Sequence, residues 1–277
     1  MADAYILPAP LRYQRPSEPY TLRDDDPLAQ GLVLWWPMVQ VSGVTARIGR
    51  SPLGVNEPVG IGGATSLVYD DFGPSLRFNG AAASTNFLRT DAPILMGALN
   101  AAYTFACWAK FESVASTYTM VCLGNSASSG NHSLILSDQV KYARAGATMI
   151  TAVAPRLNEW YRVLAWTNGN DHNLYLNGTP YGPVTSTSNT QTVNRVNAGR
   201  VENNGTTNPM LGRICDVRVW WGRVFTDVEA RYDYELATRW GIYDVPQRDV
   251  SWMSAAAASS LVIPSSAARA MRPLLVR

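Results

Sequence analysis

The sequence predicts a mainly β protein: an antiparallel two-sheet β-sandwich with one short helix near its C-terminus and an extended arm at each end. Between residues 31 and 222, short alternating or apolar runs are separated by clusters of Gly, Pro, Asn and Ser, which is the pattern of strands joined by turns. One segment near residue 226 has the apolar repeat of a helix. Neither pattern extends into the first 27 residues or past residue 241, so both ends are expected to be arms.

The composition excludes several classes of protein. Of 277 residues, 47% are hydrophobic and 16% are charged, with a net charge of +2, so the chain as a whole is not intrinsically disordered. Of the 23 basic residues 21 are Arg, but they form no basic stripe, which argues against a nucleic-acid partner. No apolar run approaches the roughly 18 residues of a membrane span, and Met1–Pro10 does not resemble a secretory signal. We therefore expect a globular protein without a membrane partner, synthesised in the cytoplasm of its host cell.

Residues 1–27 are expected to form an extended N-terminal arm. Their prolines restrict φ and remove amide donors, which disfavours helices and central strands. Large apolar side chains lie between these prolines, more than a solvated linker usually carries. The arm either packs along its own domain or docks on a neighbouring subunit, because extended segments bind partners through backbone pairing and side-chain pockets. The candidate contact residues are Tyr5, Leu7, Leu11, Tyr13 and Tyr20.

Residues 28–240 are expected to form the sandwich, including the helix. Alternation is clearest in Tyr103–Phe111, whose odd-numbered residues would lie on one face, with Trp108 and Lys110 on the other. Asn177-Gly178 is a strong hairpin signal, because both residues tolerate positive φ. The expected strands span residues 32–36, 66–71, 75–79, 103–111, 118–123, 133–137, 140–144, 148–153, 159–167, 172–178, 192–198 and 211–221.

The helix is expected over residues 227–240. Thr226 and Glu229 have the spacing of a capping box, and Gly241 would end the helix. An apolar residue recurs at every fourth position, forming a stripe that would pack on the sandwich while acidic residues face solvent. The stripe consists of Val228, Tyr232, Leu236 and Trp240, and the acidic residues are Asp227, Glu229, Asp233 and Glu235.

Residues 241–277 are expected to form a connector and an extended C-terminal tail. Residues 254–260 contain only Ser and Ala, and Pro264 and Pro273 interrupt the sequence that follows, so a regular helix is not expected. This tail is a second candidate docking arm. Its candidate contact residues are Leu261, Ile263, Leu274 and Leu275.

Five parts of the sequence, taken in order, resemble the laminin-G-like, concanavalin A-like jelly-roll family. The resemblance covers about residues 28–240 and implies a jelly-roll sandwich. Trp240–Pro246 also resembles a motif that follows such domains in virion proteins of tailed bacteriophages. Because the family is functionally broad, the fold alone does not give a function. The matching segments are Gly31–Pro37, Ser75–Gly80, Tyr103–Phe111, Asn158–Val163 with Leu174–Gly178, and Leu211–Trp220 with Arg223–Glu229.

The reactive residues form no recognised catalytic set, so we expect a protein that is not an enzyme. Glycosidases related to this family carry paired carboxylates spaced as Glu-x-Asp-x-x-Glu, and this spacing does not occur. His132 and His172 lie beside Asn in segments typical of turns, so both are expected to face solvent. Cys107, Cys122 and Cys215 lie in predicted strands without Cys-x-x-Cys spacing, which predicts core residues and no zinc site.

Two polar loops, residues 124–132 and 201–208, are candidate glycan contacts. They are rich in Asn, Ser, Gly and Thr but lack aromatic residues, and ordinary turn chemistry explains the same composition. No cofactor is expected apart from calcium as a candidate, since the resemblance implies calcium binding at the sandwich rim in related domains. The candidate glycan residues are Asn125, Asn131, His132, Asn203 and Asn204, and the candidate calcium residues are Asp91, Asp138 and Asp171.

Together these observations predict a structural protein of a bacteriophage virion, either a capsid decoration (cement) protein or a fibre component attached to head or tail. Its arms would bind the major capsid protein or tail proteins, and further copies of the same chain. The charged fraction of 16% is lower than the typical ~25%. Protein interfaces are enriched in Arg and depleted in Lys, and most basic residues of this chain are Arg. Both observations favour a protein that functions as part of an assembly. The alternative is a carbohydrate-binding adhesin that recognises glycans on the host surface.

Overall fold

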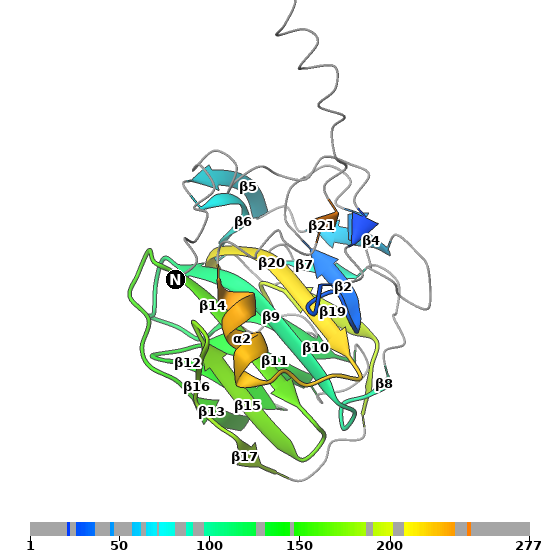
Figure 1. Ribbon diagram of the computed structural model, residues 1–277. Coiled ribbons are helices and arrows are strands. Elements are labelled where there is room, and N and C mark those ends of the chain that lie inside the picture. The colour runs from blue at the N-terminus through cyan, green and yellow to red at the C-terminus, as the bar shows by residue number, and fades with distance from the viewer. Residues whose placement is uncertain are drawn as a thin grey trace, which may run out of the picture. The chain divides into compact units, whose positions relative to one another are not determined.

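Most of the described chain lies in two β-sheets that pack face to face (Figure 1). Apart from Asp244, the described residues belong to one compact unit, residues 1–243, and residues 244–277 are a second unit. The structure is a computed structural model that describes residues 21–22, 26–36, 45–46, 57–61, 65–70, 72–80, 87–90, 97–125, 131–144, 147–186, 191–201, 208–235 and 243–244.

One sheet has eight strands, and its central strands β10, β11 and β19 form the layer behind β9 in Figure 1. All of its strand pairs are antiparallel. Its order is β13 (Ala147–Thr151), β12 (Val140–Arg144), β11 (Asn131–Leu136), β10 (Tyr118–Gly124), β19 (Arg195–Ala198), β7 (Leu88–Thr90), β4 (Glu57–Ile61) and β3 (Thr45–Ala46).

The other sheet has nine strands, again in antiparallel pairs, so the predicted antiparallel two-sheet sandwich is confirmed. Its path is β16 (Thr179–Pro180), β15 (Asp171–Leu176), β14 (Trp160–Thr167), β9 (Tyr103–Phe111), β20 (Leu211–Trp221), β6 (Gly73–Asn79) and β5 (Thr65–Asp70), with β17 (Val184–Thr185) beside β15 and β2 (Leu32–Trp36) beside β20. The remaining strands are β1 (Thr21–Leu22), β8 (Gly97–Ala98), β18 (Thr192–Val193) and β21 (Tyr243–Asp244).

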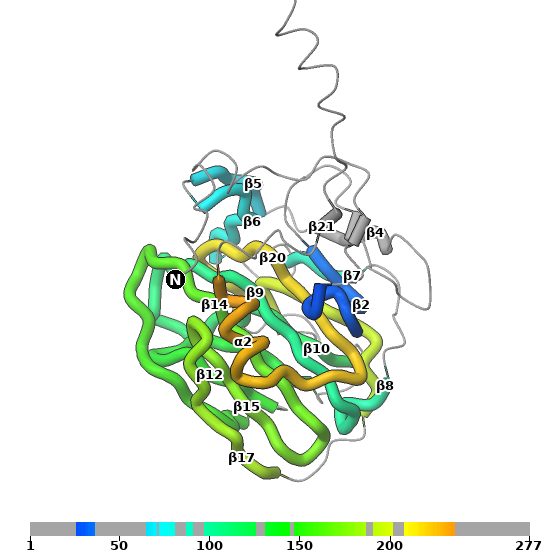
Figure 2. The backbone as a smooth tube through the Cα atoms, in the orientation of Figure 1, coloured from blue at the N-terminus to red at the C-terminus, as the bar shows by residue number. Residues whose placement is uncertain are grey.

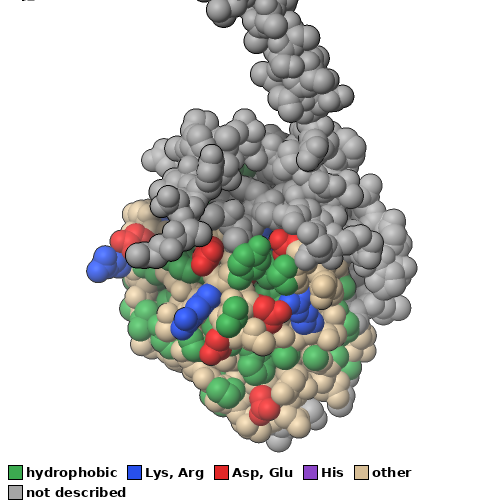
Figure 3. Space-filling view, viewed as in Figure 1, with side chains coloured by type: hydrophobic (Ala, Val, Ile, Leu, Met, Phe, Trp, Pro, Cys, Tyr) green, Lys and Arg blue, Asp and Glu red, His purple; other side chains and the backbone are tan. Residues whose placement is uncertain are grey.

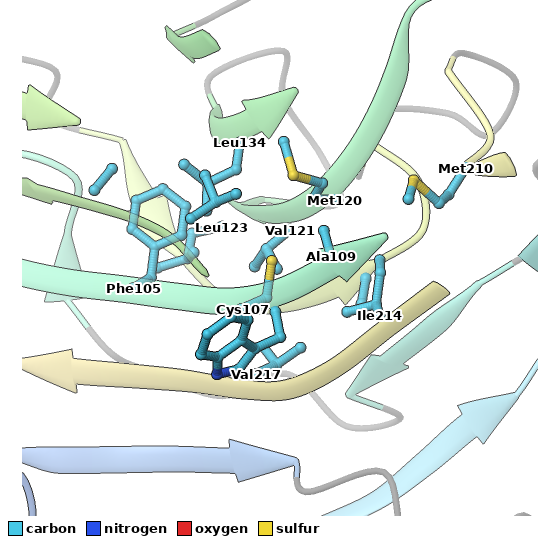
Figure 4. Close-up of a cluster of buried hydrophobic side chains, with 14 of the residues drawn as sticks. Phe105, Cys107, Ala109, Met120, Val121, Leu123, Leu134, Met210, Ile214 and Val217 are labelled. Carbon is cyan, nitrogen blue, oxygen red and sulfur yellow. The ribbon is translucent and has the colours of Figure 1, made fainter. Parts of the chain in front are cut away.

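Apolar side chains from alternate strand positions fill the space between the sheets. Phe105 and Cys107 of β9 face Val121 and Leu123 of β10 across this core, as Figure 4 shows. The alternation follows from the two-residue period of a strand, and it confirms the inward face predicted for Tyr103–Phe111. Burial of apolar surface, at roughly 25 cal/mol per Å², is the main stabilising contribution of such a core.

The three cysteines form no disulfide and are fully buried, as the sequence predicts. Cys107 and Cys215 belong to the core between the sheets. Burial raises the pKa of the Cys107 thiol, which keeps it protonated and unreactive. Cys107 and Cys215 therefore serve as small core side chains.

Helix α2 (Asp227–Tyr234) lies on the outer face of the nine-stranded sheet, and Figure 2 shows the chain turning back from β20 into it. Its buried residue Ala230 packs in a second apolar cluster with Leu164 of β14 and Tyr175 of β15. The predicted capping box is present: the Thr226 Oγ1 accepts from the Glu229 backbone N–H, and the Glu229 carboxylate accepts from the Thr226 N–H. These two bonds satisfy donors that a helix start otherwise leaves open.

Two predictions about this helix are wrong. It ends at Tyr234, with Glu235 as an extended C-cap, and not at Trp240. Val228 of the expected buried stripe is 76% exposed, whereas Asp233, expected in solvent, is 1% exposed. The reason is electrostatic: two buried arginines of the sheet bind Asp233, and this sets which side of the helix faces inward. Leu236 and Trp240 lie outside the described residues.

The predicted hairpin turn at Asn177-Gly178 is confirmed. It joins β15 to β16, and both residues have positive φ, 52° at Asn177 and 73° at Gly178. A turn with this twist matches the twist of the flanking strands. The Asn177 Oδ1 also accepts a hydrogen bond from the Arg162 backbone N–H at 2.9 Å, so the turn is tied to β14.

Most of the two arms lies outside the described residues: of residues 1–27 the structure describes 21–22 and 26–27, and of residues 241–277 it describes 243–244. The expected contacts of the arms remain predictions. Among the described residues, no helix is long and apolar enough to cross a membrane. The candidate contact residues outside the described ranges are Tyr5, Leu7, Leu11, Tyr13, Tyr20, Leu261, Ile263, Leu274 and Leu275.

Candidate functional site

A row of long polar and aromatic side chains crosses the outer face of the nine-stranded sheet. Strand pairing places one residue from each of four strands in this row. Their sequence neighbours point into the core, so these side chains must point outward. The row consists of Arg77 of β6, Arg213 of β20, Lys110 of β9 and Trp160 of β14.

Asp70, at the end of β5, holds three members of this row. Its Oδ2 accepts from the Arg213 Nη1 at 3.0 Å, from the Trp160 Nε1 at 3.4 Å and from the Lys110 Nζ at 3.5 Å. Its Oδ1 accepts from the Phe72 backbone N–H at 3.0 Å, which fixes the carboxylate in its own turn. The side chains of Asp70, Lys110 and Arg213 are about one-fifth exposed, so part of each faces solvent, whereas the Arg213 Nε is buried.

A second ion pair lies at the β6 end of the row. Arg77 binds both oxygens of Glu112, at 2.8 Å from Nε and 2.7 Å from Nη2. The hydrogen bond from Arg77 lowers the pKa of Glu112, and Glu112 in turn raises the pKa of Arg77. A two-point contact of this kind fixes the orientation of the guanidinium plane.

Aromatic rings lie directly beside these charges. Phe72 stacks on Trp160, with ring centroids 4.5 Å apart and an interplanar angle of 18°, and it contacts Trp108 at 4.8 Å. Phe72 and Trp160 are partly exposed, whereas Trp108 lies beneath them at 2% exposure. Tyr234, the last residue of α2, contacts the Trp108 ring at 5.8 Å. We call Asp70, Phe72, Trp108, Lys110, Trp160 and Arg213 the aromatic face.

The aromatic face combines two kinds of recognition. The exposed parts of Phe72 and Trp160 offer flat apolar surface, and Lys110 and Arg213 offer hydrogen-bond donors beside it. Figure 3, viewed from the side that carries α2, shows hydrophobic, basic and acidic side chains interspersed on the described surface. Such a surface suits a ligand with both apolar faces and hydroxyl or anionic groups.

The glycan residues predicted from sequence that the structure describes, Asn125, Asn131 and His132, do not lie on this face. Asn131 and His132 belong to β11 of the other sheet. Asn131 is 4% exposed, and its Oδ1 accepts from the Ser133 Oγ at 3.3 Å, while the Asn125 Oδ1 accepts from the Asn194 Nδ2 at 3.3 Å. Asn203 and Asn204 lie outside the described residues.

The expectation of solvent-facing histidines is wrong. His132 is 1% exposed and His172 is fully buried, because both lie inside strands of the sandwich. The His132 Nδ1 contacts the hydroxyls of Tyr103 and Tyr142, the latter at 2.7 Å, and the His172 Nε2 lies 2.7 Å from the Ser186 Oγ. Burial lowers the pKa of His132 to about 3 and that of His172 to about 4, so both are neutral at pH 7.

The described candidates for calcium are engaged in local hydrogen bonds. Asp138 pairs with the Lys141 Nζ at 2.8 Å, and Asp171 accepts from the Thr185 Oγ1 at 2.7 Å. Within the described ranges, no group of three or more His, Cys, Asp or Glu side chains is arranged to hold a metal ion. Asp91 lies outside those ranges.

Sequence reasoning missed the aromatic face because it searched loops, where glycan contacts often lie. The rings come instead from strands β9 and β14 and from the turn after β5. One signal was present: the alternation of Tyr103–Phe111 placed Trp108 and Lys110 together on the side away from the core. The pairing of that strand with Trp160 and Arg213 requires the tertiary structure.

The family is shown by a sequence comparison. The laminin-G-type model of the concanavalin A-like lectin/glucanases superfamily matches residues 79–229, more than half of the chain. The chain belongs to this concanavalin A-like superfamily. Comparison with curated protein sequences gives no match.

Solved structures share the concanavalin A-like fold at low sequence identity. Domain 4 of an extracellular arabinanase from Geobacillus stearothermophilus, in complex with arabinotriose, matches with a TM-score of 0.52 and 15% identity over 74% of this chain and 98% of that one. The binding domain of Paraclostridial Mosquitocidal Protein 1 matches with a TM-score of 0.57 and 12% identity over 75% and 52%. A botulinum neurotoxin type C structure, described by entry into cells that depends on two ganglioside molecules, gives 0.55 and 10% over 75% and 51%. The chain spans about half the length of the two toxin chains.

Proposed function

We propose that this concanavalin A-like domain is a glycan-binding module and that the aromatic face is its binding surface. The observation that carries the proposal is the stacked, partly exposed pair Phe72 and Trp160 beside the donors of Lys110 and Arg213. A sugar ring has an apolar face edged by hydroxyls, and this surface offers a partner to each. Similar domains support the class of ligand, since one holds arabinotriose and another protein enters cells through gangliosides.

We propose that the module binds without catalysis. Two described carboxylates, Asp70 of the aromatic face and Glu112 beside it, are each held by cations, Asp70 by Lys110 and Arg213 and Glu112 by Arg77. A glycosidase acid must instead be kept protonated near neutral pH, and the Arg77 contact does the opposite by lowering the pKa of Glu112. Polysaccharide depolymerisation assays on the full chain are expected to show no product.

The test uses the full chain on a glycan array, with and without calcium, followed by titration of the best ligand. Trp160→Ala is expected to weaken binding about tenfold, because it removes one ring of the stacked pair. Trp166→Ala is the matched control, since Trp166 is a partly buried, outward-facing tryptophan of the same strand that packs beside α2. Absence of glycan binding, or equal weakening by both variants, would overturn the proposal.

We further propose that the chain serves as a component of a bacteriophage virion, as a decoration or fibre protein held by its terminal segments. The support is in the sequence: apolar side chains between prolines in residues 1–27, a similar tail at 241–277, and the Arg-rich, charge-poor composition. The partners would be capsid or tail proteins and further copies of the chain. Removal of residues 1–25 or 253–277 is expected to leave a folded domain that no longer joins particles. Unchanged incorporation of both truncated chains would contradict this assignment.

A further inference from the structure

Tyr234 is an exposed aromatic residue at the border of the aromatic face. It is the last residue of helix α2 and is 37% exposed, and its ring centroid lies 5.8 Å from that of the buried Trp108. The partly exposed Phe72 contacts the same Trp108 ring, at 4.8 Å. A single buried indole ring therefore connects two exposed aromatic positions, one at the turn after β5 and one at the end of α2.

Contacts on two sides fix the position of Tyr234. The residue before it, Asp233, is buried and accepts hydrogen bonds from Arg162 at 2.6 Å and from Arg218 at 3.1 Å. The turn after β15 passes close to the ring, because a Cβ added at Gly178 would lie 3.6 Å from the Tyr234 Cβ. A side chain that the fold already holds in place loses little conformational entropy when it contacts a ligand.

The two aromatic positions suit different parts of one extended ligand. Phe72 and Trp160 stack on each other at 4.5 Å, so together they act as one position, and the Lys110 Nζ lies 5.9 Å from the centre of the Trp160 ring. Tyr234 offers a separate ring and a hydroxyl, which can donate or accept a hydrogen bond. A single sugar ring is about the size of one aromatic side chain, so it would occupy the first position and leave Tyr234 uncovered. An oligosaccharide can reach both, because a glycosidic oxygen links each of its rings directly to the next.

We propose that Tyr234 is a second aromatic contact of the glycan-binding surface, so that this surface prefers an oligosaccharide of two or more linked rings to a single sugar. One ring would lie on Phe72 and Trp160, and a following ring on Tyr234. The inference rests on the proposed glycan-binding function and adds the size of the ligand to it. It also gives α2 a part in binding, since the C-terminal end of this helix carries Tyr234.

The test measures how affinity depends on the length of the glycan. The full chain is applied to an array on which each oligosaccharide is printed beside the disaccharide and monosaccharide that it contains, such as arabinotriose with arabinobiose and arabinose. Calorimetric titration then compares the tightest-binding oligosaccharide with its own fragments. The oligosaccharide is expected to bind at least about tenfold more tightly than the monosaccharide, because it gains a second aromatic contact. Equal affinities would overturn the proposal.

Tyr234→Ala is expected to remove this advantage of length and to leave the affinity for the monosaccharide unchanged. A general loss of structure would instead weaken both ligands, so the ratio of the two affinities separates a direct contact from a structural role. Tyr234→Phe keeps the ring and is expected to retain most of the advantage. Tyr69→Ala is the matched control, because Tyr69 is 62% exposed and points to the opposite side of β5 from Asp70. Equal effects of Tyr69→Ala and Tyr234→Ala on oligosaccharide binding would contradict a specific contact.

The outcomes separate this inference from the proposed function. Trp160→Ala is expected to weaken binding of the monosaccharide and the oligosaccharide alike, since it alters the first aromatic position. If Tyr234→Ala leaves the advantage of length unchanged while binding stays sensitive to Trp160→Ala, the role of Tyr234 is overturned and the glycan-binding function stands. Failure of every glycan to bind would overturn both proposals.

Discussion

Arg162 of β14 donates to both carboxylate oxygens of Asp233 in helix α2, from Nε at 2.6 Å and from Nη2 at 2.9 Å, and neither side chain is exposed by more than 1%. A second arginine, Arg218, donates to the same carboxylate at 3.1 Å. Arg218 also donates to the Asp216 Oδ1 at 2.9 Å, so Asp216 compensates its charge. Burial opposes the charge of Arg162, but Asp233 and Asp216 outweigh it and raise the pKa of the guanidinium. The Arg162 guanidinium also lies 5.9 Å from the Trp108 ring, so this buried network supports the aromatic face from below.

Replacement of Asp233 by Asn is expected to lower the free energy of unfolding by about 3–5 kcal/mol, because it leaves a buried positive charge without compensation. Urea titration of the full chain measures the change. Glu235→Gln, the same carboxylate-to-amide change at the exposed C-cap, is expected to stay within about 0.5 kcal/mol. Similar effects of the two substitutions would mean that the buried network does not anchor the helix.

The side of α2 that packs on the sheet can be tested with a pair of substitutions. Val228→Glu is expected to change stability by no more than about 0.5 kcal/mol, since Val228 is 76% exposed and an acid is favourable in the first turn. Ala230→Leu is expected to cost about 1–3 kcal/mol, because Ala230 is buried and a larger side chain overpacks the cluster. Thermal or urea unfolding measures both changes in stability. A larger loss for Val228→Glu than for Ala230→Leu would mean that the helix packs on the face predicted from sequence.

Stability is expected to fall as the pH is lowered from about 6.5, the ordinary pKa of histidine. Burial lowers the pKa of His132 to about 3, so between these pH values the unfolded chain binds a proton that the folded chain does not, and stability must rise with pH. The loss is about 1.4 kcal/mol per pH unit for His132, with His172 acting in the same direction.

Urea titrations at pH values of about 7, 6 and 5 measure this slope above the range in which carboxylates titrate. His132→Phe keeps a buried ring but removes the proton-binding group, so its slope is expected to be shallower. The same slope in the variant and in the unaltered chain would assign the pH dependence to other groups.

Gly199 and Gly222 form a matched pair for backbone strain. Both have positive φ, +85° and +76°, so an added methyl group costs about 1–2 kcal/mol at either position. At Gly199 the new Cβ would lie 2.3 Å from the Phe78 Cε1, whereas at Gly222 it meets nothing within 4 Å. Gly199→Ala is therefore expected to be less stable than Gly222→Ala by about 1–3 kcal/mol in urea titrations. Equal stabilities would show that the Phe78 ring moves aside freely.

Features that depend only on neighbours along the chain can be predicted from the sequence. The inward side of Tyr103–Phe111 follows from alternation, the turn at Asn177-Gly178 from tolerance of positive φ, and the helix start from the reciprocal bonds of Thr226 and Glu229. Each of these signals lies within a few residues, so no knowledge of the rest of the fold is needed to read it.

Which polar groups are buried, and which side chains contact each other, depends on how distant strands pack and is not visible in the local sequence. Asp233 is buried and Val228 is exposed, the reverse of the expectation from sequence. The reason is that Arg162, 71 residues before Asp233 in the chain, binds it in the interior. His132 lies in the core and not in the expected turn, because Tyr103 and Tyr142, on two other strands, supply its hydrogen-bond partners. A charge or an imidazole can be buried when distant groups satisfy it, and only the pairing of strands brings those groups together.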